Sequence, residues 1–331
     1  MRVLNAGDGA AVQEAASWLA QGGLVAFPTE TVYGLGARAD DPRAVQKIFA
    51  AKGRPSAHPL IVHVADAAAA QAFAASWPEL AQRLTQAFWP GPLTVIVPRR
   101  DTVAADAAGG QASIGLRCPS HPVAQALLVA AGRLGVPGVA APSANRFGRI
   151  SPTRAEHVVS EFQACDQLLL LDGGACPLGI ESAIVDCSRG WPVLLRPGTL
   201  DRHRIEAAAG VALQAPDAAA PRAPGTLAAH YAPRARVRLM APPMLAAALE
   251  VLAGNGGAPA SAVAVYSRTV GVPPAVPWRP MPPDAAAAAH ELFLALRELD
   301  ASGAPLIWVE QPPDTPEWDG VRDRLQRAAA A

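Results

Sequence analysis

The sequence predicts a mixed α/β fold followed by a second, smaller α/β domain. Up to about residue 200, short apolar runs typical of strands alternate unevenly with helical patterns, and some strands follow one another directly. Uneven alternation favours a mixed sheet over a strict Rossmann repeat. Near residue 210 the chain becomes rich in Ala, Pro and Gly, and a βαβ-like pattern follows, which predicts a small parallel sheet.

These changes divide the chain of 331 residues into a first domain over residues 1–209, a linker over 210–234 and a second domain over 235–331. The tail has no Gly-rich phosphate fingerprint, so we expect it to be structural or regulatory. Its expected strands and helices alternate over residues 237–240, 244–253, 262–266, 284–299, 306–310 and 317–328.

The strands of the first domain are predicted from short apolar or β-branched runs that end at turn residues, as Pro28 ends the first. They are expected over residues 24–27, 60–64, 93–97, 113–117, 136–140, 168–171, 182–186 and 193–196.

The helices are predicted from caps and apolar periodicity. Asp40 or Asp41 should cap a helix whose first residue is Pro42, and Gly53 should close it. Ser120 should cap another helix. The expected helices are residues 11–21, 42–52, 66–76, 78–88, 120–131 and one that starts near Ser151.

The composition excludes some functions. With 28 basic and 28 acidic residues, the chain does not resemble a protein that coats nucleic acid or an anionic membrane. The amino terminus lacks a signal-peptide pattern, and no apolar run approaches the roughly 18 residues of a membrane span, so we expect a cytoplasmic protein. The four cysteines form no C-x-x-C pair and no zinc spacing, which favours free, packed thiols.

Polar residues gather at the ends of the predicted strands, where open α/β sheets bind ligands. Each alone has an ordinary explanation, such as a solvated arginine, a core histidine or a helix cap, and these alternatives stay open. The residues concerned are Thr31, His63, Arg117, Ser143, Asn145, Ser182 and Arg196, together with Lys52 and Arg54 just past a helix.

Common catalytic motifs are missing from the sequence. It contains no Walker loop, no G-x-S-x-G and no H-E-x-x-H. Gly34 and Gly36 lack the third glycine of a dinucleotide fingerprint, so we interpret them as permitting a tight turn.

The motifs that are present closely resemble those of the YrdC-type threonylcarbamoyl-AMP synthases, in the long form that carries an extra carboxy-terminal domain. Nine segments match in order. They are Phe27–Gly36 (FPTETVYGLG), Ala51–Leu60 (AKGRPSAHPL), Ile61–Val64 (IVHV), Gly91–Thr94 (GPLT), Ile114–Pro119 (IGLRCP), Ala141–Asn145 (APSAN), Gly179–Asp186 (GIESAIVD), Leu195–Gly198 (LRPG) and Ala223–Pro233 (APGTLAAHYAP).

This resemblance implies a twisted mixed α/β sheet with a large open cavity, and a nucleotidyltransferase. The implied reaction converts ATP, L-threonine and bicarbonate or CO2 into threonylcarbamoyl-AMP and pyrophosphate, with Mg2+ accompanying ATP. A partner transferase would use the product to form threonylcarbamoyladenosine in tRNA.

The resemblance also implies a role for individual residues. Lys52 and Arg54 are expected to be catalytic, and Arg117 to bind the threonine carboxylate through its planar fork. The expected ATP-binding residues are Lys52, Arg54, His58, Ser113, Ser143, Ser151, Arg196 and Tyr231, the last carried by the linker as part of a lid over the site. The expected threonine-binding residues are Thr31, His63, Arg117, Ala141 through its backbone, and Ser182.

Two departures from the family pattern are His58, where asparagine is usual, and Ala183, where threonine is common. Two other functions compete with the synthase. One is a YrdC-like module that binds RNA weakly and has no synthase activity. The other is the carbamoyl-adenylate chemistry of hydrogenase-maturation proteins, although their acylphosphatase-like and zinc-finger modules are not visible in this sequence.

Overall fold

The computed structural model of the chain describes residues 1–254 and 260–331 and divides them into two compact units. The first unit comprises Met1–Phe147 and Ser151–Thr226. The second comprises Gly148–Ile150 and Leu227–Ala331.

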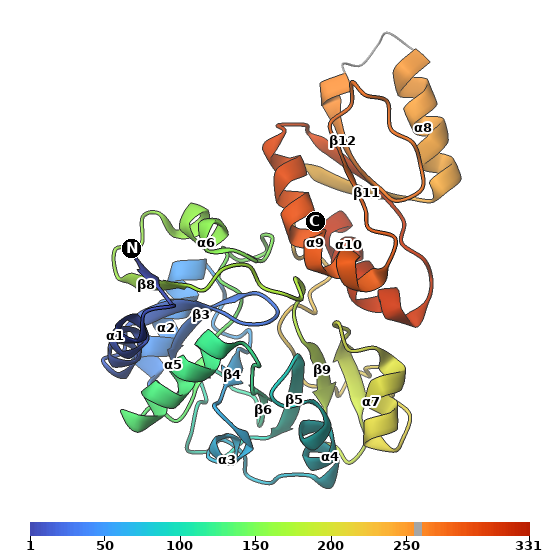
Figure 1. Ribbon diagram of the computed structural model, residues 1–331. Helices are drawn as coiled ribbons and strands as arrows, with labels where there is room; N and C mark the ends of the chain where they lie inside the picture. The colour runs from blue at the N-terminus through green and yellow to red at the C-terminus, as the bar shows by residue number, and fades with distance from the viewer. Residues whose placement is uncertain (255–259) are drawn as a thin grey trace. The chain divides into compact units, whose positions relative to one another are not determined.

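A ten-stranded sheet forms the first unit, in the order β1-β8-β2-β3-β7-β4-β6-β5-β9-β10 (Figure 1). Parallel and antiparallel neighbours are interspersed, which confirms the predicted mixed sheet. The strands are β1 Arg2–Asn5, β2 Leu24–Pro28, β3 Tyr33–Arg38, β4 Ile61–His63, β5 Leu93–Pro98, β6 Ser113–Arg117, β7 Val139–Ala140, β8 Leu168–Asp172, β9 Ala183–Asp186 and β10 Val193–Arg196.

Helices cover both faces of this sheet. Side chains alternate along β2, so that Val25 and Phe27 pack with α1 and α5, which lie side by side (Figure 1). Leu24 and Ala26 belong instead to the cluster that contains Ile48 of α2. The helices are α1 Gly9–Ala20, α2 Pro42–Lys52, α3 Ala67–Ala70, α4 Glu79–Phe88, α5 Pro122–Arg133, α6 Ala155–Phe162 and α7 Arg202–Ala209.

Helix α2 follows its predicted signals. Asp41 accepts a hydrogen bond from the Arg43 N–H, Pro42 is the first helical residue, and Gly53 ends the helix with φ at 64°. The left-handed conformation suits glycine, so the helix ends where the sequence predicts.

Four helix and strand predictions are wrong in extent. The helix expected over 66–76 is only α3, because Ala74 bridges to Arg99 beyond β5. Helix α5 is capped by His121, while the Ser120 N–H donates to a carboxylate elsewhere. Helix α6 begins at Ala155, and the strand expected over 136–140 is only β7 because the Val136 N–H still bonds to the end of α5.

The predicted glycine turn is also wrong. Gly34 and Gly36 lie inside β3, which pairs antiparallel with β2. A Cβ on Gly36 would lie 2.7 Å from Val139 and 2.8 Å from Phe27, so the glycine permits close packing within the sheet. Four regular elements had no signal strong enough to predict them from the sequence: β1, β3, α7 and β13 (Trp278–Pro280).

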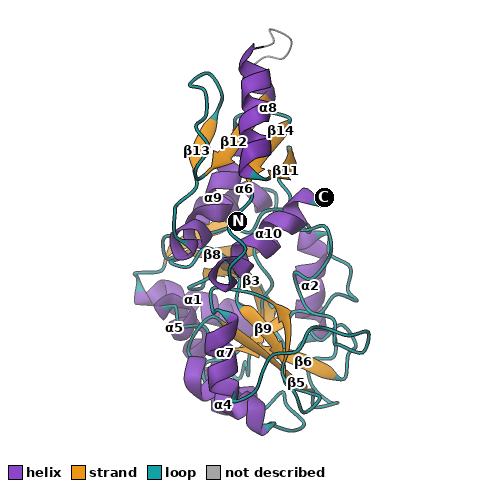
Figure 2. Cartoon of the chain, turned by 90° about the vertical axis from the view of Figure 1, so that its right-hand side faces the viewer, coloured by secondary structure: helices purple, strands orange, loops and turns teal. Residues whose placement is uncertain are grey.

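The second unit contains a four-stranded parallel sheet in the order β11-β14-β12-β13, which confirms the parallel sheet predicted for the tail. Helix α8 packs along β14 in this unit (Figure 2). Its remaining elements are β11 Arg236–Met240, β12 Val263–Ser267, β14 Leu306–Glu310, α8 Pro242–Gly254, α9 Ala285–Ala301 and α10 Asp319–Ala329.

All four cysteines are free, and three of them are buried. Burial raises the pKa of the Cys118 thiol to about 11, so this cysteine is a packed, protonated group, as predicted. Across residues 1–254 and 260–331, every helix falls short of the length or apolar character that a membrane span requires.

Candidate active site

Three adjacent strands of the large sheet, β4, β6 and β5, bring two predicted site residues, His63 and Arg117, into one row with Thr94. His63 at the end of β4 lies directly opposite Arg117 at the end of β6. Thr94 of β5 lies one step beyond the Val95–Leu116 pair and is therefore the neighbour of Arg117 on its other side. Lateral neighbours in a sheet point to the same face, so these three side chains share one face.

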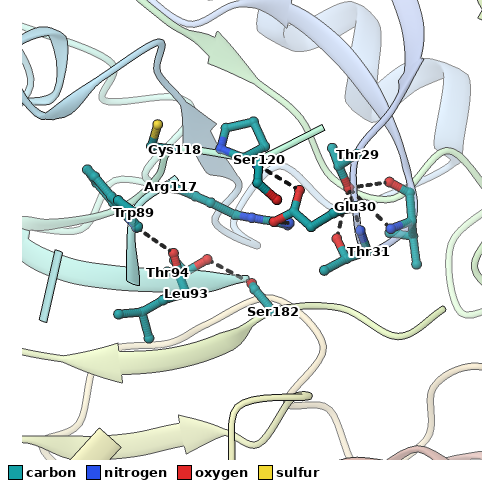
Figure 3. A network of polar contacts seen from close by, with 12 residues as sticks. Thr29, Glu30, Thr31, Trp89, Leu93, Thr94, Arg117, Cys118, Ser120 and Ser182 are labelled. Atoms are coloured by element: carbon teal, nitrogen blue, oxygen red, sulfur yellow. Dashed lines mark hydrogen bonds and ion pairs between the residues drawn. The ribbon is translucent and has the colours of Figure 1, made fainter. Parts of the chain in front are cut away.

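The segment after β2 forms a polar turn beside this row. The Thr29 and Thr31 hydroxyl oxygens lie 2.8 Å apart, and the Thr29 hydroxyl also donates to the Val32 carbonyl at 2.6 Å (Figure 3). Thr31 is fully buried. The sequence places these hydroxyls directly after an apolar strand, and their mutual hydrogen bonds satisfy them there.

Arg117 is buried and forms an ion pair with Glu30 of this turn. Its Nη2 lies 2.7 Å from Glu30 Oε1, while Glu30 Oε2 accepts the Ser120 N–H at 3.1 Å (Figure 3). The Arg117 Nε is buried and has no acceptor among the described residues. The guanidinium therefore has an N–H donor, at Nε, that could bind a ligand.

His63 is neutral in this environment. Burial first, and then the positive charge of Arg117, lower the pKa of His63 to about 3. Its ring lies edge-on to Phe27, with centroids 6.2 Å apart. A neutral imidazole next to an arginine leaves the guanidinium as the cationic group of this pair.

Ser182 links three strands. Its Oγ lies 2.8 Å from the Thr94 Oγ1, and the two hydroxyls face each other (Figure 3). Arg196 at the end of β10 donates to the Ser182 carbonyl through Nε and Nη2, at 3.1 and 2.9 Å, and Nη2 also lies 3.2 Å from Ser182 Oγ. Nη1 of Arg196 donates to the Pro224 carbonyl at 3.0 Å. The predicted threonine-side serine and ATP-side arginine are thus direct neighbours.

A second cluster contains the predicted phosphate cations. The Lys52 ammonium donates to the Ser143 and Asn145 carbonyls at 2.6 and 2.5 Å. Burial first, and then the charge of Arg54, lower the pKa of Lys52 well below its ordinary value. The Arg54 guanidinium lies 5.6 Å from the centre of the Phe147 ring. Two basic side chains gathered in one place make a site suited to an anion.

His58 lies near the cluster of Lys52 and Arg54. Ser113 lies at the start of β6 in the large sheet. The His58 ring is 5.5 Å from the Phe147 ring, and burial followed by the charge of Arg54 lowers the pKa of His58. Ser113 lines a small cavity together with Gln111 and Arg222.

Ser151 and Ala141 complete the part of the predicted site in the first unit. Ser151 is buried and donates a short hydrogen bond to the Glu181 carboxylate, next to Ser182. The Ala141 N–H donates to the Ile61 carbonyl at 2.9 Å, so the Ala141 backbone lies beside the start of β4.

Tyr231 belongs to the second unit. Its ring lies 5.4 Å from Phe293 and 4.1 Å from His230, and the Arg324 guanidinium lies 5.3 Å from its ring centre. Its φ is 61°, an uncommon conformation for a bulky residue. Its predicted contact with ATP stays a prediction.

Comparison with known families covers both units. The Sua5/YciO/YrdC family model, described as telomere recombination, matches residues 17–198. A model described as the C-terminal domain of threonylcarbamoyl-AMP synthase matches residues 200–330. The chain belongs to the Sua5/YrdC family. The second match identifies it as a member with the long-form, two-domain arrangement.

Relatives within the Sua5/YrdC family match between two thirds of the chain and almost all of it. A Pyrococcus abyssi protein named threonylcarbamoyl-AMP synthase is 36% identical over 338 residues, covering 96% of this chain and 94% of its own. A Bacillus subtilis protein of the same name is 43% identical, covering 68% of this chain and 65% of its own. The crystal structure of P. abyssi Sua5 complexed with L-threonine aligns with a TM-score of 0.87 and 34% identity, covering 97% and 95% of the two chains.

Glu30, Thr94 and Glu181 were missing from the predicted Sua5/YrdC site. All three lie inside segments that carry the family resemblance, so the signal was present. Their importance follows from contacts to Arg117, Ser182 and Ser151, which no spacing in the sequence reveals.

Among the residues that the structure describes, no group of three or more His, Cys, Asp or Glu side chains is placed to hold a metal ion. The expected Mg2+ therefore stays a prediction, as an ion that the ATP phosphates would carry.

Proposed function

We propose that this protein is an L-threonylcarbamoyladenylate synthase, which makes threonylcarbamoyl-AMP and pyrophosphate from L-threonine, bicarbonate or CO2, and ATP. The row of His63, Arg117 and Thr94 on one sheet face carries this proposal. Curated relatives named threonylcarbamoyl-AMP synthase, and a related structure complexed with L-threonine, support it. They do not favour the alternative of an RNA-binding module without synthase activity.

Arg117 would bind the threonine carboxylate, because its buried guanidinium has a donor without a partner among the described residues. Thr31, Ser182 and the backbone at Ala141 would surround the rest of the amino acid. Where family members often carry threonine this chain has Ala183, and the Thr94 hydroxyl already supplies a partner for Ser182.

The chemistry would proceed in two steps. The neutral threonine amine attacks the carbon of CO2: an N–C bond forms, one C=O electron pair moves onto oxygen, and the nitrogen releases a proton to water, which leaves a carbamate. A carbamate oxygen then attacks the α-phosphorus of ATP, and the bond to pyrophosphate breaks. Lys52 and Arg54 would stabilise the phosphate charge through this second step, with no covalent intermediate on the protein.

The remaining ATP-side residues would orient the nucleotide. Ser113, Ser143, Ser151, Arg196 and His58 would contribute to this side, and Tyr231 would act as part of a lid. Mg2+ would neutralise phosphate charge when it arrives with ATP. The product would pass to a tRNA-modifying transferase, and we expect both proteins to work in the cytoplasm.

Threonine-dependent pyrophosphate release tests this function. The protein is incubated with ATP, bicarbonate and Mg2+, with L-threonine, L-serine, L-valine or no amino acid. Serine lacks the methyl group of threonine and valine lacks its hydroxyl group, so the two amino acids test which part of the threonine side chain the protein recognises. We expect release to be fastest with threonine; a rate that is the same without any amino acid would refute the proposal.

A further inference from the structure

We infer that Glu30 is a positioning residue, which fixes the Arg117 guanidinium in the orientation that receives the carboxylate of the amino-acid substrate. This inference rests on the proposed function, because it assumes that Arg117 binds this carboxylate. Glu30 and Arg117 are 4% and 3% exposed, so their 2.7 Å ion pair is shielded from water (Figure 3).

Glu30 is itself held rigidly. Its Oε2 accepts the Ser120 N–H at 3.1 Å, and its backbone carbonyl accepts the Leu178 N–H at 2.8 Å. The carboxylate therefore connects the turn after β2 with the segment that leads into α5. A carboxylate that is anchored through one oxygen and through its own backbone can hold a flexible arginine side chain in one orientation with its other oxygen.

The ion pair does not use the whole guanidinium. Arg117 Nη2 contacts Glu30 Oε1, whereas the buried Nε has no acceptor among the described residues. Leaving a buried donor unpaired is costly, and such exceptions call for an explanation. A substrate carboxylate explains this one, because it would supply the missing acceptor.

The neighbours of Arg117 cannot replace Glu30. His63 has its pKa lowered by burial, stays neutral, and carries no charge to orient a cation. The Thr94 hydroxyl is engaged with Ser182 at 2.8 Å. Compared with these two neighbours in the row, Glu30 is therefore the group whose charge opposes that of the guanidinium.

Glu30→Gln is the direct test of this role. An amide has one accepting oxygen and one donating nitrogen, so it cannot accept both from Arg117 and from the Ser120 N–H at the present positions. Asp186→Asn is the matched control, because Asp186 is also a buried carboxylate of the first unit that is paired with an arginine, at 3.0 Å from Arg189.

For Glu30→Gln we expect L-threonine to bind at least about tenfold more weakly by calorimetry, and the threonine KM to rise by a similar factor. The Kd for ATP and the kcat should change less than about threefold. Asp186→Asn should change none of these values by more than about twofold. Threonine affinity that is unchanged in folded Glu30→Gln overturns the inference.

A double-mutant cycle with Arg117→Gln tests whether Glu30 acts through Arg117. Once Arg117 is replaced, adding Glu30→Gln should weaken threonine binding less than twofold further. An equal loss in both backgrounds would show that Glu30 acts independently of Arg117 and would overturn the inference.

Glu30→Asp covers the case in which Glu30→Gln does not fold, since it keeps the charge but withdraws the carboxylate by one methylene. It should also raise the threonine KM, and an unchanged KM counts against positioning. Failure of the proposed function is distinct from these results, because the unmodified protein would then neither bind threonine nor release pyrophosphate in response to it.

Discussion

Two buried glutamates, one in each unit, show how similar residues serve different ends. Glu310 ends β14 in the second unit, and its carboxylate accepts hydrogen bonds from the Arg268 and Thr269 N–H groups, both at 2.7 Å, and from the Ser267 and Thr269 hydroxyls, at 2.8 and 2.6 Å. Glu310 also lies 3.8 Å from the Arg268 guanidinium, whereas Glu30 in the first unit pairs with the Arg117 guanidinium at 2.7 Å. Both carboxylates are buried, so burial does not distinguish them.

The donors make the difference. A backbone N–H has one hydrogen to give, and the turn after β12 gives its hydrogens to Glu310, which stabilises this turn and leaves little for a ligand. Glu30 instead contacts the Arg117 guanidinium, which has five N–H donors and lies on the same sheet face as His63 and Thr94. An unpaired Nε does not separate the two cases, because among the described residues Arg268 beside Glu310 has one as well. The arrangement around Glu310, which we call the closed arrangement, is typical of a structural contact. The arrangement of Glu30 and Arg117, which we call the open arrangement, is typical of a binding site.

The largest effect should come from removing the donor of the open arrangement. Arg117→Gln should raise the threonine KM by at least about 100-fold, because the carboxylate loses its charged partner. It should also lower the free energy of unfolding by about 3–5 kcal/mol, since Glu30 is left as a buried, unpaired charge. Steady-state kinetics and urea denaturation measure the two effects.

Arg189→Gln is the control for Arg117→Gln, because Arg189 also pairs with a buried carboxylate, that of Asp186. We expect this variant to leave the threonine KM within about twofold. If both variants raised the threonine KM equally, the loss of any buried ion pair would explain the result, and there would be no evidence that Arg117 binds the threonine carboxylate.

Replacing Glu310, in the closed arrangement, should change stability and leave activity unchanged. Burial alone would raise the pKa of Glu310, but hydrogen bonds from Thr269, Ser267 and Arg268 together lower it to about 2. A folded-state pKa below the unfolded value contributes stability above pH 4.5, which is lost as the pH falls toward 2. Glu310→Gln should therefore cost at most about 3 kcal/mol at pH 7.

Amide hydrogen exchange of residues 263–270 measures the local loss of stability. At pH 7 we expect these amides to exchange up to about 100-fold faster in Glu310→Gln than in the unmodified protein. The difference from the unmodified protein should shrink under acid. Glu250→Gln, an exposed carboxylate on α8, is the control and should exchange as the unmodified protein does. If the loss of stability in Glu310→Gln stayed constant down to pH 2, the negative charge of Glu310 would not be what stabilises the turn.

A smaller effect is expected beside the open arrangement, at Thr94. Thr94→Val keeps the shape of the side chain but removes the hydroxyl that lies 2.8 Å from Ser182 Oγ. Losing this hydrogen bond should cost about 0.5–1.5 kcal/mol, which raises the threonine KM about threefold to tenfold. Thr85→Val is matched, because Thr85 is a buried threonine whose hydroxyl bonds to the Ala81 carbonyl in α4. If Thr94→Val and Thr85→Val changed the threonine KM equally, Thr94 would have no specific role in threonine binding.

Local signals predicted parts of the fold well. The caps of α2 and the parallel sheet of the tail follow from short-range chemistry, and both are present. The glycines in β3 were misread because their reason is distant: Gly36 packs against Val139, about a hundred residues away in sequence. Likewise, α3 ends early because Ala74 bridges to Arg99, which is a tertiary contact.

The site shows the same limit. Residues such as His63 and Arg117 were predicted from their places at strand ends and from a family resemblance, and the sheet register makes them neighbours. Glu30 was not predicted, although it directly precedes the predicted Thr31, because its partners Arg117 and Ser120 lie 87 and 90 residues away. Which polar residues are satisfied, and which keep a donor free, is decided by such contacts.

The smallest expected effect concerns His63, where we predict no titration in the working range. Burial first, and then the charge of Arg117, lower the pKa of His63 to about 3, so it stays neutral from pH 6 to pH 9. The ratio of kcat/KM between the unmodified protein and His63→Asn should therefore vary less than about twofold over this range. Titration of the threonine amine affects both proteins equally and cancels in the ratio. An inflection near pH 6.5 would mean that His63 becomes charged beside Arg117, and the open arrangement would then contain two cations competing for one carboxylate.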